Sequence, residues 1–465
     1  MRLSSWLRPL TARSALAPAP KRKRPAHRRL MLEVLEARDC PSGGLLDPTF
    51  NGTGEKVLSS SVMRVGNDVN NGVAVQPDGK IVGVGSVTRD KFGDQAISVV
   101  RMNPDGTLDS TFNGTGMATI SVGTQAFGEA VALQPDGKIL VGGRAFVKGG
   151  TEDVVARLNA NGSLDTTFGN TGRMGVAGGV WASNPTSDSG YVRDLAVLTD
   201  SSNHLTAIMV GGEHSGTFEA IKLTPAGQMD TTFGVGGDAV VSVGGVQHVA
   251  GMAVTPSGGV VMVGEAGQFG EIVALTPAGQ LDTTFNGTGY RVDSFSDQPN
   301  IPFTHFDAVT VQPTAGGRYR LIVSGATYLA GTPHGGSGLV VAYTSSGQLD
   351  STFATGGLFI TPDATEFTRV QLEADDSIAL AGWAYYTDPN GNVWQQVAVG
   401  HLSADGAADT TFGTAGTGIS LLTPLYPSGG ETPRGMAIDP AGRIVVSFDT
   451  GVNGGEAGFA RFTAP

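Results

Sequence analysis

A short motif, L-D-x-T-F, recurs along this chain and constrains its fold more than any other feature. The Asp of the motif falls at Asp47, Asp109, Asp165, Asp230, Asp282, Asp350 and Asp409. The intervals are 62, 56, 65, 52, 68 and 59 residues, so the period is about 60 residues. Repeats of this length that are built from short strands are typical of propellers and of solenoid arrays.

Each repeat contains four stretches with the alternating pattern of a β-strand. In the first complete repeat, residues 72–76 alternate apolar and polar side chains, and the Pro-Asp-Gly of residues 77–79 predicts a tight turn. Residues 80–85 and 97–102 are the second and third strands, and a fourth-strand region lies within residues 107–120. Four antiparallel strands in about 60 residues are the content of one propeller blade.

The order of the elements at the two ends favours a closed ring over an open stack. Residues 46–50 carry the fourth-strand motif without three preceding strands, and residues 459–462 are a third strand without its fourth. An open stack would need atypical capping repeats, whereas in a ring the first segment completes the last blade. We therefore predict an all-β fold: a seven-bladed β-propeller of four-stranded antiparallel blades over residues 45–465, closed by the N-terminal strand.

The joint pattern V-x-x-Q-P-D-G-K-I, R-L/M-N-x-x-G and L-D-x-T-F resembles the delta-60 repeat, a bacterial β-propeller repeat of uncharacterised function. The resemblance covers about 90% of the chain and is strongest in the first two repeats. It decays where residues 198–202 and 373–376 replace the P-D-G turn. The resemblance implies a propeller fold and brings no catalytic residues with it.

The first 42 residues differ in composition from the rest and predict a disordered basic leader. They contain ten Lys and Arg against three Asp and Glu, and they lack strand alternation. An alternative interpretation of Lys21-Arg22-Lys23-Arg24 is a nucleic-acid-binding patch. Residues 28–42 include L-E-V-L-E-A-R, which resembles the L-E-x-L-E-x-R box in the leaders of exported proteins of planctomycete-type bacteria. This resemblance implies a protein that is exported to the cell surface or the extracellular space.

The rest of the chain is acidic, with 20 Lys and Arg against 39 Asp and Glu out of the totals of 30 and 42. This balance argues against a nucleic-acid partner, because affinity for phosphates depends on Lys and Arg contacts. No run of 18 apolar residues is present, so we expect no transmembrane anchor. Cys40 is the one cysteine, so an internal disulfide is excluded. We expect a monomer.

The two ends of the predicted propeller differ in how much their loops vary. The P-D-G and N-x-x-G turns share one end and are short and alike. The loops at the other end, here called the variable-loop face, differ in length, and binding residues concentrate on such loops. Candidate binding residues there are Trp181, Tyr191, His305, Tyr328, His334, Tyr385, Tyr386 and Trp394. Aromatic side chains of this kind can stack on sugars or on a protein partner, although they can equally pack loops onto the blades.

A search for catalytic and cofactor motifs gives a negative result. There is no G-x-S-x-G, no H-E-x-x-H and no phosphate-binding loop, and no two of the seven His lie within four residues. We expect the repeated Asp to accept hydrogen bonds from backbone amides and Thr hydroxyls rather than to act in a site. We expect no cofactor. Calcium is the alternative, at residues 68–72 and 388–392, which offer oxygen ligands without full EF-hand spacing.

Two functional hypotheses follow from these observations. The first is a non-enzymatic extracellular or cell-surface propeller that binds a protein or a glycan through the variable-loop face. The alternative is a polysaccharide-directed hydrolase or lyase, with carboxylates or His gathered at the mouth of the central channel. The first is favoured because no acid–base pair or nucleophile constellation is visible in the sequence. The fold itself does not choose between them.

Overall fold

The computed structural model describes residues 43–465 apart from 59–68, 90–92, 170–177, 184–189, 244–246, 294, 296–302, 317, 329–335, 362–364, 389, 414–415, 424–429 and 452–455. The chain divides into two compact units, Met1–Pro41 and Ser42–Pro465, and the described residues belong to the second. The predicted disordered leader therefore lies outside the described residues. In the described part, no helix has the length and apolar character needed to cross a membrane.

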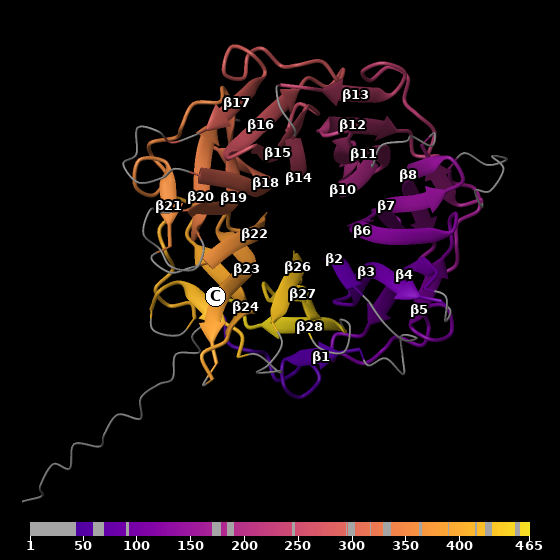
Figure 1. Cartoon of the computed structure of the whole chain (residues 1–465), viewed down its shortest axis with the longest axis horizontal. Coiled ribbons are helices and arrows are strands. Elements are labelled where there is room, and N and C mark those ends of the chain that lie inside the picture. Colours follow the sequence, from indigo (N-terminus) through magenta and orange to yellow (C-terminus); the bar gives the residue numbers. More distant parts are fainter. Residues whose placement is uncertain are drawn as a thin grey trace, which may run out of the picture. The chain divides into compact units, whose positions relative to one another are not determined.

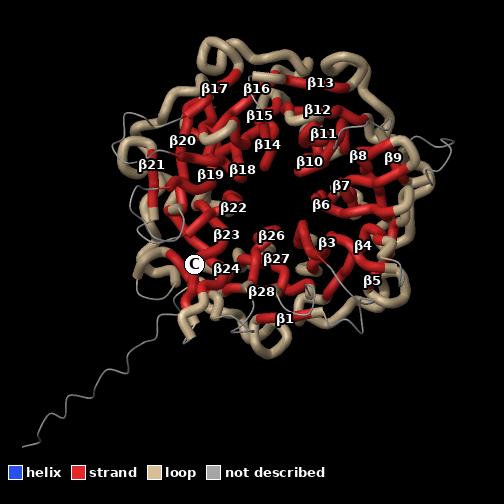
Figure 2. Tube along the Cα trace, in the orientation of Figure 1, coloured by secondary structure: helices blue, strands red, loops and turns tan. Residues whose placement is uncertain are grey.

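The described unit is a ring of seven four-stranded antiparallel sheets, and no helix occurs among the described residues (Figure 1). The strands form a ring with loops at the periphery (Figure 2), and the innermost strands line a channel at its centre. This architecture confirms the predicted seven-bladed propeller.

Each blade contributes one strand to each of four concentric layers. The innermost strands are β2 (Val69–Val75), β6 (Gln125–Leu133), β10 (Gly190–Thr199), β14 (Gln247–Val254), β18 (Phe303–Thr314), β22 (Thr365–Leu372) and β26 (Glu431–Ile438). The second strands are β3 (Ile81–Thr88), β7 (Ile139–Val147), β11 (Leu205–His214), β15 (Val260–Ala266), β19 (Arg318–Tyr328), β23 (Ile378–Thr387) and β27 (Ile444–Thr450).

The third and fourth layers complete the blades. The third strands are β4 (Gln95–Met102), β8 (Gly150–Leu158), β12 (Thr217–Leu223), β16 (Phe269–Leu275), β20 (Ser337–Thr344), β24 (Val393–Leu402) and β28 (Ala457–Phe462). The outermost strands are β5 (Met117–Ile120), β9 (Val180–Ala182), β13 (Asp238–Val241), β17 (Tyr290–Asp293), β21 (Leu358–Ile360), β25 (Ile419–Leu421) and β1 (Glu55–Val57). We number the blades one to seven from β2–β5 onwards.

The hydrophobic core lies between neighbouring blades. The second and third strands are buried along nearly their whole length, because each faces another blade on both sides. Val84 and Ile97 of blade one, for example, share a core cluster with Val141 and Val154 of blade two. The outermost β5 alternates buried and less buried positions, as expected of a strand with one face to solvent.

The repeated motif forms the turn that leads into each outermost strand. In every copy the Asp accepts hydrogen bonds from the backbone N–H and the hydroxyl of the Thr two residues later. The prediction that this Asp has a structural role in the turn is thereby confirmed. The motif's Phe is buried; Phe112, for example, packs against Gly162 in a turn of the next blade. A Cβ at Gly162 would lie 2.9 Å from the Phe112 ring.

A circle of seven backbone hydrogen bonds links each motif to the next blade. In each, the residue after the Phe donates its N–H to a carbonyl of the neighbouring turn, over 2.7 to 2.9 Å. The donor–acceptor pairs are Asn51–Asp105, Asn113–Asn161, Gly169–Ala226, Gly234–Ala278, Asn286–Ser346, Ala354–Asp405 and Gly413–Gly43. The last of these bonds joins Gly413 of blade six to Gly43 in the N-terminal segment, which completes blade seven. The ring is therefore closed.

Blade seven is assembled from both ends of the propeller sequence, as predicted. β1 pairs antiparallel with β28, and Leu46 forms a bridge with Phe462. Arg461 donates from Nε to Oδ2 of Asp47 over 2.9 Å. The N-terminal segment thus supplies the outermost strand and covers the edge that the C-terminal strand would otherwise expose.

Candidate binding site at the mouth of the central channel

The innermost strands share a register break that points one residue of each blade into the channel. The pairing of each inner strand with its neighbour skips a residue, and in β22 it skips two. The skipped residues are Asn71, Glu129, Arg193, Ala250, Asp307, Arg434 and, in β22, Phe367 and Thr368. A β-bulge of this kind re-aims a side chain. All of these residues except Phe367 line the channel cavities.

In blades two to six, a glycine on the second strand makes room for the bulge. A Cβ on Gly143 would lie 1.9 Å from the carbonyl oxygen of Phe127, and Gly212, Gly264, Gly325 and Gly382 are in the same position. Only glycine tolerates such a close approach of the inner strand. The glycine is therefore repeated for a structural reason, whereas the bulged residue beside it is free to differ between blades.

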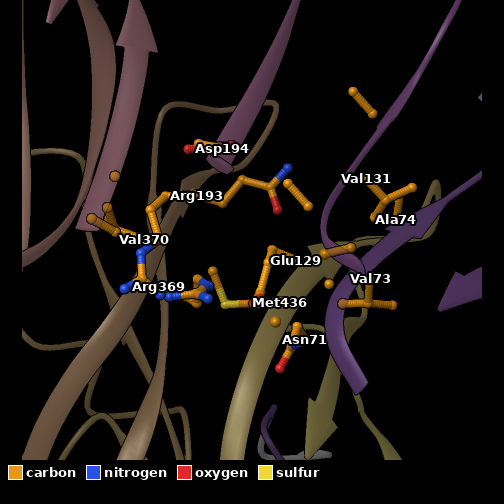
Figure 3. A pocket seen from close by; sticks show the side chains of 18 of the residues that line it. Asn71, Val73, Ala74, Glu129, Val131, Arg193, Asp194, Arg369, Val370 and Met436 are labelled. Atoms are coloured by element: carbon orange, nitrogen blue, oxygen red, sulfur yellow. The ribbon is translucent and has the colours of Figure 1, made fainter. Parts of the chain in front are cut away.

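The channel holds two adjoining cavities of unequal polarity. The wider cavity, about 520 Å³, opens toward the variable-loop face and is lined by polar side chains and by Trp383. We call this cavity the channel mouth. The deeper one, about 380 Å³, adds Asp194, Met436 and the apolar side chains of the inner strands. Figure 3 shows Arg369 and Glu129 reaching into this deeper space from different strands.

Three arginines from three blades line the channel mouth: Arg193, Arg369 and Arg434. Arg434 forms a salt bridge with Asp449 over 2.7 Å. Neither Arg193 nor Arg369 has a salt bridge within the described part of the chain. Arg369 donates to the carbonyl of the preceding Thr368 over 2.7 Å. Because a guanidinium carries five donors, most of the donors of Arg369 remain available to a ligand.

The charges at the channel mouth shift one another's protonation. Burial lowers the pKa of Arg369, the nearby Arg434 and Arg193 lower it further, and Asp194 and Asp307 oppose this. Burial raises the pKa of Glu129 and also that of Asp194. Asp194 is held by the backbone N–H groups of Leu195 and Met252. Arginine keeps its charge in proteins, whereas buried carboxyls move toward the neutral form.

His305 lies between two carboxylates at the same mouth. Its Nε2 is 3.3 Å from Oδ2 of Asp307 and 3.3 Å from Oε1 of Glu366. Burial alone would lower the pKa of His305, but the two carboxylates outweigh burial and raise it to about 11. His305 therefore keeps its proton near neutral pH in this arrangement.

The predicted binding residues fall into four groups. Tyr191 and His305 lie on inner strands near the channel mouth, and Tyr191 lies under Arg144 and Arg193, with guanidinium-to-ring distances of 4.1 and 5.1 Å. Trp181 is 4% exposed and packs in the core from β9. The side chain of Tyr328 and the whole of His334 lie outside the described residues.

The remaining predicted residues lie on the β23–β24 hairpin of blade six. Tyr386 pairs with Trp394, and the Trp394 indole donates to Asp388 over 3.3 Å. Tyr385 packs edge-on against Trp383 with ring centroids 4.9 Å apart. Of the aromatic side chains described on this hairpin, Trp383 is the one that lines the channel mouth. The sequence did not single out this residue.

The two loops considered for calcium give no added support to a metal site. Asp388 accepts hydrogen bonds from the backbone N–H groups of Asn390 and Asn392 and from the Asn392 side chain. These bonds are those of a turn-forming Asp. Asp68 lies outside the described residues.

Sequence reasoning missed the residues that line the channel mouth, including Glu129, Arg193, Glu366, Arg369 and Arg434. A signal for most of them was present. Most of these residues lie within three residues before the alternating run of the innermost strand of their blade. At this position, repeats that are otherwise similar differ in charge. Alignment of the repeats with one another would have shown this variation.

Comparison with known proteins supports the repeat architecture. Residues 76–112 and 134–168 match the model of DUF5122, a domain of unknown function described as a beta-propeller. Two of the seven repeats therefore resemble this β-propeller family. No curated protein matches the sequence.

Several solved structures are similar in fold at low sequence identity. Sqt1 from Chaetomium thermophilum is 12% identical, with 88% of this chain and 100% of that chain covered and a TM-score of 0.42. YCF48 bound to D1 peptide is 10% identical, with coverage of 91% and 98% and a TM-score of 0.45. The polysaccharide lyase Uly1 is 9% identical, with coverage of 85% and 90% and a TM-score of 0.44.

Proposed function

We propose that this propeller is a non-enzymatic recognition module that binds an acidic glycan at the channel mouth, on its variable-loop face. The observation that carries the proposal is the pair Arg193 and Arg369, which face one cavity without a salt bridge among the described residues. Charged donors in a partly dehydrated cavity favour an anionic ligand that satisfies them.

A glycan suits this site better than a protein partner. A cavity of about 520 Å³ falls in the range of small-molecule sites, which hold one or a few sugar units. Trp383 lines it and is fixed edge-on by Tyr385, so its ring is available for stacking on a sugar. Guanidinium groups bind the carboxylate of a uronic acid in a bidentate manner.

Calorimetric titration with oligogalacturonate and with a neutral oligogalactoside tests this proposal. We expect binding of the acidic sugar, weakened by salt, and no binding of the neutral one. Arg193→Ala and Arg369→Ala should each weaken binding about 10- to 100-fold, as for the loss of a charged hydrogen bond. Arg318→Ala, at the opposite end of a blade, is the matched control and should bind as wild type.

The titration can also contradict the proposal. Equal affinity for the neutral sugar, or full binding by Arg193→Ala and Arg369→Ala, would remove the arginines from the site. A polyglutamate peptide that binds more tightly than the acidic sugar would replace the glycan with a protein partner.

Catalysis on a polysaccharide is the second candidate, favoured by the presence of His305, Asp307 and Glu366 at the same mouth. Two features weigh against it. A His that keeps its proton up to a pKa of about 11 is a poor general base near neutral pH. Both carboxylates also face the same His305 nitrogen, which occupies the space where a glycosidic oxygen would sit between them. Incubation with acidic polysaccharides should therefore release neither new reducing ends nor unsaturated uronates; either product would establish a hydrolase or a lyase.

We further propose that residues 1–42 are an export leader and that the propeller, built of delta-60-type repeats, acts at the cell surface or outside the cell. The L-E-V-L-E-A-R sequence within residues 28–42 supports this. Fractionation of cells that express the full chain, and the same chain with this box replaced by alanines, tests it. Equal recovery of both proteins inside the cell would contradict an export role.

A further inference from the structure

Two neighbouring inner strands bring three potential metal ligands together at the channel mouth. His305 on β18 and Glu366 on β22 occupy equivalent positions, since the carbonyl of each packs against the glycine that faces the bulge. Asp307 is the bulged residue of β18. The three side chains converge between blades five and six, where Nε2 of His305 lies 3.3 Å from an oxygen of each carboxylate.

Two of the three distances between their ligand atoms match a tetrahedral metal site. Nε2 of His305 is 3.3 Å from a carboxylate oxygen of Asp307 and 3.3 Å from one of Glu366. The three ligand atoms lie within 4.8 Å of one another. In a tetrahedral site with metal–ligand bonds of about 2.0–2.1 Å, adjacent ligand atoms are about 3.3–3.4 Å apart.

Hydrogen bonding alone leaves this cluster incompletely satisfied. A single Nε2–H has one proton to donate, yet two carboxylates approach that nitrogen at the same distance. Oδ2 of Asp307 is buried and, although 3.3 Å from Nε2, has no partner in hydrogen-bond geometry. A cation in place of the proton would satisfy both carboxylates at once.

We propose that His305, Asp307 and Glu366 bind a divalent transition-metal ion of the zinc type through Nε2 and one oxygen of each carboxylate. Imidazole together with two carboxylates favours Zn²⁺ over Ca²⁺, which prefers six to eight oxygen ligands. Trp383 pairs with Glu366 across β22 and β23, so its side chain lies beside this ligand. Asp307 and Glu366 line the channel mouth, so the fourth position is open to a ligand there. The metal site stands independently of the acidic glycan.

The chain contains a matched control for this site. His401 also lies between two carboxylates, but its Nδ1 is 2.9 Å from Asp409 and its Nε2 is 3.7 Å from Glu373. Carboxylates on opposite ring nitrogens cannot share one ion with the imidazole. Glu373→Gln should therefore leave metal binding unchanged.

Titration of the metal-stripped full chain with ZnCl₂, followed by calorimetry, tests the proposal. We expect one tight Zn²⁺ per wild-type chain, and weaker binding of Ca²⁺. Glu366→Gln and Asp307→Asn, which preserve side-chain shape, should weaken Zn²⁺ binding by more than about 100-fold, above the 10- to 100-fold typical of outer-shell changes. Thermal unfolding in EDTA controls for the folding of both variants.

Cobalt substitution gives a second readout that needs no variant. Co²⁺ in the wild-type chain should show the intense visible absorption of a tetrahedral site, which one equivalent of Zn²⁺ abolishes. Absence of a one-to-one Zn²⁺ site, wild-type affinity in both Glu366→Gln and Asp307→Asn, or tighter binding of Ca²⁺ than of Zn²⁺ would overturn the proposal.

Discussion

At the scale of single residues, the Asp of the repeated motif keeps its role while its cationic partner changes. The salt bridges from the third strand to the motif are Arg101–Asp109, Arg157–Asp165, Lys222–Asp230 and Arg461–Asp47, over 2.8 to 3.1 Å. In blade six, Nδ1 of His401 lies 2.9 Å from Oδ2 of Asp409 at the same position. In blade four, Ala274 precedes the turn instead, and Asp282 has no cation partner in the described part of the chain. The Thr bonds are therefore the shared element, and the cation is an addition of some blades.

This difference predicts unequal costs for the same substitution in two blades. Asp109→Asn removes the charge that faces the buried Arg101, so we expect the free energy of unfolding to fall by about 2–4 kcal/mol. Asp282→Asn replaces a charged acceptor of the two Thr284 hydrogen bonds by a neutral one. It should lower the free energy of unfolding by about 1 kcal/mol or less. Urea unfolding of both variants at pH 7 measures the two costs. Equal costs would show that the Arg101 salt bridge does not contribute to stability.

The sequence predicted one half of this arrangement. The Asp and Thr are two residues apart, so their turn is a local feature that residue types alone reveal. The Arg101–Asp109 salt bridge depends on the path of the chain between these two residues. It also depends on the burial of both side chains, which a single sequence does not display. The third strand's Arg was visible as part of a repeated pattern, but its partner became evident only with the turn in place.

At the scale of elements, the seam between blades two and three buries three carboxylic acids. Glu219 on β12 is 6% exposed, and Asp153 on β8 is 4% exposed. Burial, and then the charges of Asp153 and Asp238, raise the pKa of Glu219 to about 9. Burial also raises the pKa of Asp153 and that of Asp238, although His214 opposes it for Asp238. The folded seam thus holds protons that the unfolded chain releases near pH 4.

This seam predicts a loss of stability as pH rises. Between the ordinary Glu pKa and about 9, folded Glu219 binds more proton than the unfolded chain, so the free energy of unfolding falls with pH. The contribution is fully present below about pH 4, and its slope is at most about 1.4 kcal/mol per pH unit for one group. Chemical unfolding from pH 5 to 9 should show this decline in wild type and a smaller one in Glu219→Gln.

A neighbouring position supplies the control for this experiment. Val240 pairs directly with Glu219 on β13 and is 50% exposed. Val240→Ala alters the same place in the sheet without a titratable group, so its pH slope should equal that of wild type. If Glu219→Gln retains the full slope, the pH dependence arises elsewhere in the propeller.

Element-scale features of the candidate site were the least accessible to sequence reasoning. The strands and turns carry periodic signals, whereas the bulge is an insertion of one residue that an alternating pattern conceals. Arg193 is itself a bulged residue and Arg369 directly follows the bulge of β22, so alternation marks neither position. His305 was proposed as a binding residue, but its companions Asp307 and Glu366 come from two blades, and only the ring brings them together.

At the scale of the whole molecule, the number of repeats and the order of their strands were enough to predict the fold. Seven copies of one motif gave the number of blades, and the complementary ends gave the mode of closure, because both are properties of the order of elements along the chain. Packing detail was not needed for either. The circle of seven inter-blade hydrogen bonds adds a physical reason for closure, since the bond from Gly413 to Gly43 exists only when the first segment is in place.

Removal of the closing segment should therefore weaken the entire ring. Deletion of residues 45–60 removes β1, the buried Phe50 and the Asp47 partner of Arg461, which is itself 1% exposed. Loss of a buried Phe and of one member of a buried ion pair each cost about 3–5 kcal/mol, and the edge of β28 becomes exposed. We expect a single thermal transition shifted down by at least about 10 °C, on the scale of a few degrees per kcal/mol. Val292→Ala, at an exposed position of another outermost strand, should melt as wild type. An unchanged melting curve after the deletion would mean that the blades are stable without closure, and that the N-terminal strand does not stabilise the ring.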